Sequence, residues 1–475
     1  MCRMRSSYCW GCLATPSRLL KQASANPSLV DGMVGKRFFL VISVVMLLAL
    51  AACQMIAPSL LPTSAVVEPQ SAESTPPPAL LTQTPLDNAI PEDANTPAGP
   101  ITLRLWLPQQ FDPGGSTPAG DLLNARLSEF MDENPGVRIE VRLKALEGSG
   151  GLLESLAAAN AAAPLALPDL IALPRPLLES AALKGLVHPY DGMTGVLEAD
   201  GWYDYARQLA YLQESIFGLP FAGDALVLVY HPLDMDIPPR DWETAMSIGS
   251  ALAFSAADSQ ALFTINQYQA AGGTVWDAQG HPYLDESVLT QVLTFYQQAS
   301  QSGLMPLWLT QLESDEQVWQ AFLEEQAPMA VVWASHYFTE APGLSFKTMI
   351  APPITADGQI NTMATGWIWA LAAPDRARRM LAAQLAEFLV EPQFLAEWNY
   401  AARYLPPNTQ ALTGWEDPLQ RTLIGRILEA AQLSPSEDLL SSLGPALEQA
   451  VLFVLKQQAD PTTAAQIAVK QVNQP

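Results

Sequence analysis

The chain has 475 residues, of which 49% are hydrophobic, and 48 acidic against 24 basic residues give it a net charge of −24. This balance argues against nucleic-acid binding, which needs basic surface patches. No cysteine follows Cys53, so the rest of the chain has no disulfide and must depend on a large hydrophobic core.

The first recognisable element is a secretory signal over residues 33–53. Lys36 and Arg37 precede an apolar run over residues 38–48, and the run ends in Leu-Ala-Ala-Cys53. A charged segment, a short apolar segment and a small-residue cleavage site are typical of a signal peptide. The cysteine resembles that of a bacterial lipobox, which implies lipid attachment at Cys53 and a stable membrane anchor. The alternative is an uncleaved transmembrane anchor, for which the run is short, since a span needs about 20 residues.

The segments on either side of this signal have no features of a folded domain. A signal peptide begins close to its charges, so we expect Met33 to be the true start and residues 1–32 to be a non-native extension. Residues 33–52 are then the signal peptide. Residues 54–99 hold nine prolines and no Lys or Arg, so we expect residues 53–99 to be a lipid-anchored, disordered tether.

The next part of the chain alternates between strand and helix patterns. Residues 101–107 and 137–143 alternate apolar and polar side chains, which is typical of strands, and 169–173 is a short apolar run. Residues 121–133 and 151–163 have the apolar spacing of helices. Strands separated by helices predict a mainly parallel sheet with helices on both faces.

The second half contains clear helix boundaries. A helix is predicted from Asp285 to Ser302, with Gly303 as its end. Ser314 and Gln317 form a capping box, and Asp417 and Asp460 each precede a proline at a first helical position. About 375 ordered residues exceed one hydrophobic core, so we expect two lobes.

These segments, in this order, resemble the extracellular solute-binding proteins of ABC importers, in particular the sugar-binding group that includes maltose-binding protein. The resemblance covers nearly all of residues 101–475. It is carried by the following segments: ITLRLW (101–106), LSEFMDENPGVRIEV (127–141), LPDLIAL (167–173), LKGLVHPYD (183–191), IFGLPFAGDALVLVYHPLD (216–234), IPPRDWETA (237–245), the tract 272–305, VWQAFLEEQAPMAVVWASH (318–336) and the tract 364–408.

The resemblance implies an α/β fold of the two-lobed periplasmic-binding-protein type, each lobe a mainly parallel sheet flanked by helices, with a hinge between the lobes. Lobe 1 would comprise 100–213 and 346–400, and lobe 2 would comprise 214–345 and 401–475. It also implies a membrane-tethered, monomeric lipoprotein on the extracytoplasmic face of the membrane. This protein would capture a solute, most often a carbohydrate, and deliver it to an ABC permease.

The resemblance, together with the needs of sugar recognition, points to a set of ligand-binding residues. Sugar rings need flat apolar surfaces for their C–H groups and polar side chains for their hydroxyls. Asp224 matches an acidic residue of the segment that crosses between lobes, and Trp367 matches a tryptophan of the cleft floor. The full set of expected ligand contacts is Asp224, Trp367, Trp333, Ser335, Trp106, Trp276, Tyr404 and Phe221.

Several departures from the family pattern leave the ligand open. After the strand at 169–173, where sugar binders often present an aromatic and an acidic residue, the chain has Leu173, Arg175 and Pro176. Arg175 could meet an anionic solute, so a non-sugar polar or anionic ligand is an alternative. A sensor or receptor component that presents its ligand to a membrane protein is another.

Catalysis and metal binding have little support in the sequence. No hydrolase, zinc-protease or phosphate-loop motif occurs, and the four histidines are scattered without ligand spacing. We therefore expect a protein that is not an enzyme and that needs no cofactor and no metal.

Overall fold

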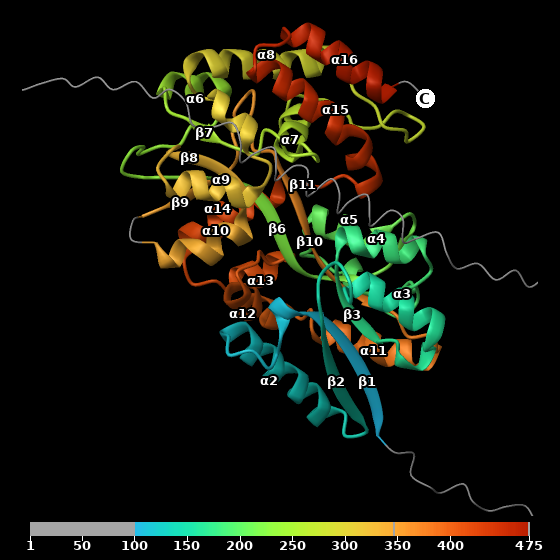
Figure 1. The fold of residues 1–475 in the computed structure, drawn as a ribbon. Coiled ribbons are helices and arrows are strands. Elements are labelled where there is room, and N and C mark those ends of the chain that lie inside the picture. The colour runs from blue at the N-terminus through green and yellow to red at the C-terminus, as the bar shows by residue number, and fades with distance from the viewer. Residues whose placement is uncertain (1–99, 345–346, 474–475) are drawn as a thin grey trace, which may run out of the picture. The chain divides into compact units, whose positions relative to one another are not determined.

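The computed structural model describes residues 100–344 and 347–473. The predicted signal peptide, the lipidation residue Cys53 and the proline-rich tether lie outside these residues. The described part has a mixed α/β fold, in which helices flank a nine-stranded sheet (Figure 1).

Three parallel strands open the described chain, and a helix follows each of them. β1 pairs with β2 along its whole length and with β3 at Leu105 and Trp106. The first long helix begins where Gly120 N donates a hydrogen bond to Thr117 Oγ1 (3.0 Å), and Pro118 occupies its first position. The elements are β1 (Ile101–Pro108), η2 (Gln109–Phe111), α2 (Pro118–Glu133), β2 (Val137–Lys144), α3 (Leu152–Ala162), β3 (Leu170–Pro174) and α4 (Arg175–Leu183). The predicted alternation of strands and helices is confirmed.

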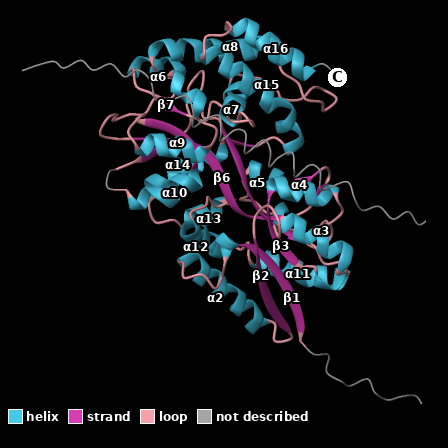
Figure 2. Ribbon diagram, in the orientation of Figure 1, coloured by secondary structure: helices cyan, strands magenta, loops and turns pink. Residues whose placement is uncertain are grey.

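Two long strands, β6 (Leu219–Tyr230) and β10 (Thr362–Leu371), connect the two ends of the sheet (Figure 2). The first half of β6 pairs antiparallel with β10, and its second half pairs with β8 (Met329–Trp333) and β9 (Met349–Ala351). The strand order is β2-β1-β3-β10-β6-β8-β7, with β9 beside β6 and β11 (Ala431–Leu433) beside β10. Every residue of β6 is buried, which explains why its sequence is a nearly continuous apolar run.

The second half of the chain contains most of the helices, and the helix predicted from Asp285 to Ser302 is confirmed. Asp285 accepts hydrogen bonds from the first turn of α8, and Gly303 ends this helix with a positive φ of 85°. The further helices are α5 (Asp204–Ala210), α6 (Trp242–Ile248), α7 (Leu262–Ala270), α8 (Glu286–Ser302), α9 (Asp315–Leu323), α10 (Ala334–Glu340), α11 (Arg376–Phe388), α12 (Pro392–Ala402), α13 (Thr409–Thr413), α14 (Pro418–Glu429), α15 (Glu437–Leu455) and α16 (Pro461–Asn473). The remaining short elements are η3 (Pro164–Ala166), η4 (Val196–Glu198), β4 (Tyr211–Leu212), β5 (Ser215–Ile216), β7 (Leu252–Ala253), η5 (Leu307–Gln311) and η6 (Ala341–Gly343).

Within the described residues, α15 is the one helix that is long and apolar enough to cross a membrane. Half of its most apolar window is buried in the protein, and it packs against α7, α8 and α16. Gly444 on α15 lies against the backbone of Ser259 and Gln260, where a β-carbon would clash. A helix that packs against its neighbours in this way meets the same criteria of length and apolar composition as a membrane-spanning helix.

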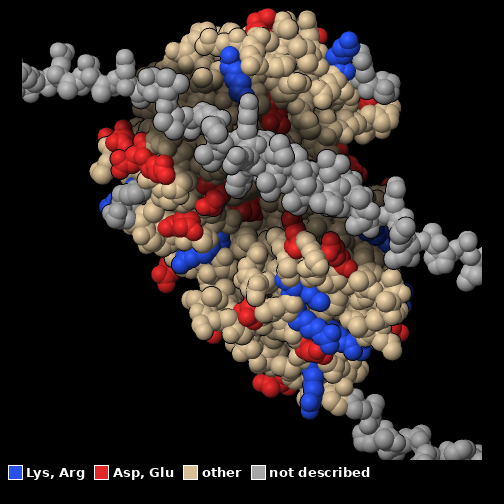
Figure 3. All heavy atoms as spheres, viewed as in Figure 1, with Lys and Arg blue, Asp and Glu red and all other residues tan. Residues whose placement is uncertain are grey.

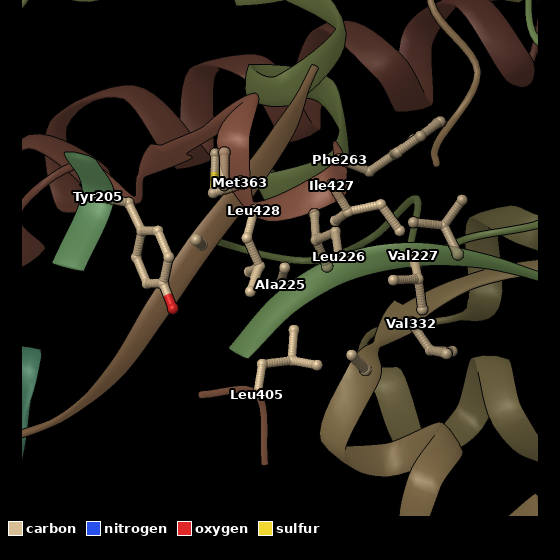
Figure 4. Close-up of a cluster of buried hydrophobic side chains, with 14 of the residues drawn as sticks. Tyr205, Ala225, Leu226, Val227, Phe263, Val332, Met363, Leu405, Ile427 and Leu428 are labelled. Atoms are coloured by element: carbon tan, nitrogen blue, oxygen red, sulfur yellow. The ribbon is translucent and has the colours of Figure 1, made fainter. Parts of the chain in front are cut away.

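The hydrophobic core follows the two long strands. Figure 4 shows Ala225, Leu226 and Val227 of β6 among side chains of β8, β10 and α14. A second, smaller cluster lies under α3 and α4 and includes Trp106. Because side chains alternate along a strand, Trp106 joins this smaller cluster while its neighbours Leu105 and Leu107 join the main one.

An ion pair between the buried Asp169 and the partly exposed Arg378 joins β1, β3 and α11. Asp169, which is 2% exposed, accepts hydrogen bonds from Arg378 at both carboxylate oxygens, at 2.7 Å and 2.5 Å. The backbone N–H of Arg104 donates to the same carboxylate at 2.8 Å. The acid of the Pro-Asp segment therefore holds β1, β3 and α11 together.

Candidate functional site

Two predicted residues, Asp224 and Ser335, are in direct contact. Asp224 lies on the buried strand β6 and is 7% exposed. Its Oδ1 accepts hydrogen bonds from the backbone N–H groups of Ala225 (2.9 Å) and Ser335 (3.0 Å), and its Oδ2 accepts from Ser335 Oγ. The residue that precedes α10, Trp333, supplies no side-chain cap. Asp224, on β6, therefore accepts the hydrogen bond of a backbone N–H group at the start of α10 that the helix itself leaves unpaired.

The surroundings of Asp224 disfavour its charged form. Burial is the main reason that the pKa of Asp224 is raised to about 7; the hydrogen bonds from Ser335 and Ala225 oppose this rise, and the charge of Asp315 adds to it. At neutral pH this carboxyl group is therefore poised between its neutral and charged forms. It can accept hydrogen bonds in both forms, and in the neutral form it can also donate one.

An aromatic cluster lies next to Asp224, with Phe111 of η2 at its centre. The ring of Phe111 meets Trp367 at 4.8 Å, Phe221 at 5.5 Å and Tyr404 at 5.8 Å, all edge to face. Gln110 Nε2 donates to the hydroxyl of Tyr404 at 3.1 Å. Burial raises the pKa of Tyr404 to about 12, and the charge of Asp224 raises it as well. Tyr404 and Asp224 therefore lie near enough to influence each other.

The structure thus brings together five of the eight predicted residues: Asp224, Ser335, Trp367, Tyr404 and Phe221. We call these five, with Phe111, the β6–β10 cluster. Phe221 itself is 2% exposed and stacks on Trp369 at 4.2 Å between ring centres. It therefore packs against the other rings of the cluster from the protein interior. Sequence reasoning missed Phe111, whose only signal was its place three residues after β1, a strand that contains Trp106.

Trp333 borders a separate acidic pocket of about 220 Å³. Its backbone N–H donates to Asp315 Oδ2 at 3.3 Å, and the same oxygen lies 3.1 Å from Nδ1 of His336. We call this the Trp333 pocket; it is lined by Leu226, Phe254, Ser255, Asp258, Gln260, Leu262, Phe263, Glu313, Ser314, Asp315, Val331 and Trp333. Three acids and no Lys or Arg line it. The face drawn in Figure 3 carries further acidic side chains, in keeping with the net charge of −24.

The other two predicted tryptophans lie away from the β6–β10 cluster. Trp106 is 3% exposed in the smaller core, and the Lys144 ammonium group sits 4.4 Å from its ring centre. Trp276 is 52% exposed and lines a wide, open cavity of about 720 Å³ together with Arg175, Glu179 and residues of the 433–442 segment.

Arg175 is engaged within the protein. Its Nε donates to Glu179 Oε1 at 2.7 Å. Its Nη1 donates to the carbonyl oxygens of Gln208 (2.8 Å), Leu209 (2.6 Å) and Tyr211 (2.9 Å) at the end of α5. Because a carboxylate already neutralises its charge and helix-end carbonyls occupy one of its nitrogens, Arg175 is a poor candidate for meeting an anionic solute.

Among residues 100–344 and 347–473, no group of three or more His, Cys, Asp or Glu side chains is placed to hold a metal ion.

Comparisons with known proteins bear on this arrangement. A family model described as bacterial extracellular solute-binding protein matches residues 125–422. A search of curated protein sequences found no match.

Several solved structures share the fold. The cyclic alpha-maltosyl-1,6-maltose binding protein from Arthrobacter globiformis is similar with a TM-score of 0.66 and 19% identity, over 79% of this chain and 98% of that one. The maltose-binding periplasmic protein MalE from Listeria monocytogenes, in complex with maltose, has a TM-score of 0.64 and 16% identity, over 78% and 96%. An ABC transporter solute-binding protein from Thermotoga lettingae, bound with alpha-D-tagatose, has a TM-score of 0.58 and 19% identity, over 78% and 99%.

Proposed function

Because the chain belongs to the family of bacterial extracellular solute-binding proteins, we propose that its solute is a carbohydrate, which it delivers to an ABC import permease. The observation that carries this proposal is the β6–β10 cluster. There, the carboxyl group of Asp224 and the hydroxyl of Ser335 lie beside the rings of Trp367 and Tyr404. The three similar structures described above contain or are named for saccharides, which supports the same ligand class.

The chemistry of the cluster suits a sugar ring. The ring of Tyr404, which lines a cavity, offers a flat apolar surface on which the C–H face of a pyranose can pack. Trp367 is 7% exposed, so in this proposal its ring would meet the sugar only when the lobes part. Asp224 can exchange its hydrogen bonds with Ser335 for hydrogen bonds with sugar hydroxyls. A carboxyl group that is close to its titration point can accept from one hydroxyl and donate to another.

We further propose that ligand capture changes the position of α10 relative to β6. The contact between Asp224 and Ser335 joins the two elements directly. A sugar hydroxyl that competes for Asp224 would therefore alter this junction. In this proposal the lobes are residues 100–213 with 346–400 and residues 214–345 with 401–475, and they close around the ligand by hinge motion.

The proposed cellular setting follows from the sequence. The family is extracellular, and we propose that the protein is held at the outer face of the cell membrane by lipid on Cys53, with residues 53–99 as a tether. We also propose that the protein acts as a monomer and performs no reaction. The family and the fold are those of binding proteins, and transport energy would come from a separate subunit.

Isothermal titration calorimetry of the purified protein against a panel of neutral and acidic mono- and oligosaccharides tests this proposal. A saccharide should bind, and Asp224→Asn and Trp367→Leu should each weaken it. Trp276→Leu serves as the matched control, because Trp276 lies away from the cluster. A panel without any binding saccharide, in a folded protein, would contradict the proposal and favour a sensor or a non-sugar ligand.

A further inference from the structure

A third pocket, of about 380 Å³, is lined in part by residues of α10, α12 and α14. Figure 1 labels these three helices. We call it the α10–α12 pocket. It is lined by Tyr337, Phe338, Ala341, Pro342, Lys347, Thr348, Asn399, Tyr400, Arg403, Tyr404, Trp415 and Gln420. Only Tyr404 of this set had been singled out from the sequence, because the other residues meet only in the folded protein.

The walls of the α10–α12 pocket are aromatic. Phe338 and Tyr400 both meet Trp415 edge to face, at 6.1 Å and 5.5 Å between ring centres, and Tyr337 meets Phe338 at 5.3 Å. Tyr400 is 52% exposed, so part of its ring is open to solvent at the pocket. Several rings at angles to one another provide surfaces on which a hydroxylated ring can pack.

One polar atom of this lining is buried and unpaired. Asn399 is fully buried, and its Nδ2 donates to the carbonyl oxygens of Phe221 and Leu395, both at 2.9 Å. Its Oδ1 has no hydrogen-bond partner among the described residues. An unsatisfied buried acceptor calls for an explanation, and a hydroxyl group of a ligand in the pocket would supply the missing donor.

The pocket also has a positively charged lining, in a chain whose net charge is −24. Its lining contains Lys347 and Arg403 and no acidic residue. Neither of these basic side chains forms an ion pair with any residue that the structure describes. The guanidinium group of Arg403 lies 5.9 Å from the ring centre of Tyr400, a contact that leaves its charge without a carboxylate partner. Arg403 ends α12 with a positive φ of 66°, a conformation that is costly for a residue with a β-carbon.

The α10–α12 pocket adjoins the β6–β10 cluster. Tyr404 belongs to both, and the hydrogen bond from Asn399 to the carbonyl of Phe221 connects the two. The Trp333 pocket, by contrast, is acidic and repels a negative charge. A ligand that spans these sites would therefore bind in one direction, with any negatively charged end in the α10–α12 pocket.

We propose that the α10–α12 pocket binds an anionic ring of an oligosaccharide, a sugar that carries a carboxylate or a sulfate, with Arg403 and Lys347 facing the anion and Asn399 Oδ1 accepting from a ring hydroxyl. This inference rests on the proposed function, which it narrows to acidic glycans. It also replaces Arg175, whose charge is neutralised by Glu179, with Arg403 and Lys347 as the residues that would bind an anion.

Matched pairs of ligands test the charge preference. Calorimetric affinities are measured for trigalacturonate and its methyl ester, and for a 6-sulfated glucose oligomer and its unsulfated form. The anionic member of at least one pair should bind about tenfold more tightly or better, because hydrogen bonds between charged partners are the strong ones. The preferred pair distinguishes a carboxylate from a sulfate. The preference should also weaken as NaCl is raised from 0.05 M to 0.5 M.

Variants assign the preference to this pocket. Arg403→Gln and Lys347→Gln should each bring the affinity ratio between anion and neutral partner toward one, and Arg403→Lys should retain most of it. Lys347 is exposed and lies outside helices and strands, so its variant avoids any folding defect of Arg403→Gln. Lys470→Gln, an exposed basic residue on α16, is the control and should leave the ratio as it is.

The outcomes separate this inference from the proposed function. If neutral saccharides bind as tightly as their anionic partners, or if the ratio survives both Gln variants, the inference is wrong and the carbohydrate function stands. If no saccharide binds at all, the carbohydrate function fails. A crystal soaked in glucuronate and glucose 6-sulfate then shows whether the α10–α12 pocket binds an anionic sugar. If neither molecule occupies the pocket, the inference is overturned as well.

Discussion

Replacing Asp224 by Asn should make the protein increasingly stable relative to wild type as pH rises. Asparagine has the same shape as aspartate. Its Oδ1 can accept from the N–H groups of Ala225 and Ser335, and its Nδ2 can donate to Ser335 Oγ. The substitution therefore keeps the contact with α10 and removes only the titration.

The magnitude follows from the pKa of the carboxyl group. It is 3.8 in the unfolded chain and about 7 in the folded one, so folding binds a proton more tightly. The stability that Asp224 contributes is thus complete below pH 3.8 and is lost as pH rises through 7. A shift of this size corresponds to roughly 4 kcal/mol between pH 4 and pH 8, which the Asn variant does not lose.

Urea unfolding followed by tryptophan fluorescence measures this difference. Wild type and variant are compared at several values from pH 4 to pH 8, so that all other titrating groups cancel. The free energy of unfolding of the variant should rise relative to wild type by roughly 4 kcal/mol over this range. Parallel pH curves for the two proteins would refute the account of a buried, poised carboxyl group at this position.

Three further substitutions, the first paired with a control, test other parts of the fold. Trp367→Ala should lower the free energy of unfolding by about 3–5 kcal/mol, because it opens a cavity beside Phe111. Trp276→Ala, at an exposed position, should change it by about 0.5 kcal/mol or less. Denaturant titration measures both free energies, and equal effects would contradict the burial of Trp367. Asp169→Asn should lower the free energy of unfolding by about 3 kcal/mol in the same assay, because it leaves Arg378 without its carboxylate. An unchanged free energy would mean that this ion pair does not hold β1, β3 and α11 together. Gly444→Ala should lower the melting temperature by several degrees, because its β-carbon would meet the carbonyl oxygen of Ser259, and an unchanged transition in calorimetry would show that α15 can shift freely.

Local signals in the sequence were sufficient for much of the fold. Asp285, Ser314 and Asp417 each cap the helix that their pattern predicted, because a cap depends only on the next two or three residues. The early strands were equally readable, since residues 101–107 and 137–143 alternate apolar and polar side chains and residues 169–173 form a short apolar run. The fold class followed from these elements and from the resemblance to solute-binding proteins.

The candidate site was only partly predictable. Asp224 and Ser335 are 111 positions apart, and the pairing of β6 with β8 brings them together, so only the resemblance pointed to both. Trp106 was expected near them because it lies close to the end of a strand. However, the alternation of that strand already placed it on the face opposite Leu105 and Leu107.

The α10–α12 pocket could not have been found in the same way. Its aromatic residues come from α10, α12 and the loops that follow α12 and α13, and only Tyr404 among them had been singled out from the sequence. Arg403 has no acidic neighbour in the pocket, and the lack of a carboxylate partner is a property of the folded protein alone.

The most direct test of the central claim is a calorimetric titration of the purified protein with saccharides, both neutral and acidic, carried out in parallel with Asp224→Asn and Trp367→Leu. The account predicts that at least one saccharide binds and that both substitutions weaken it, while Trp276→Leu does not. A saccharide that binds the wild type and both variants of the β6–β10 cluster equally would place the site elsewhere and contradict the account.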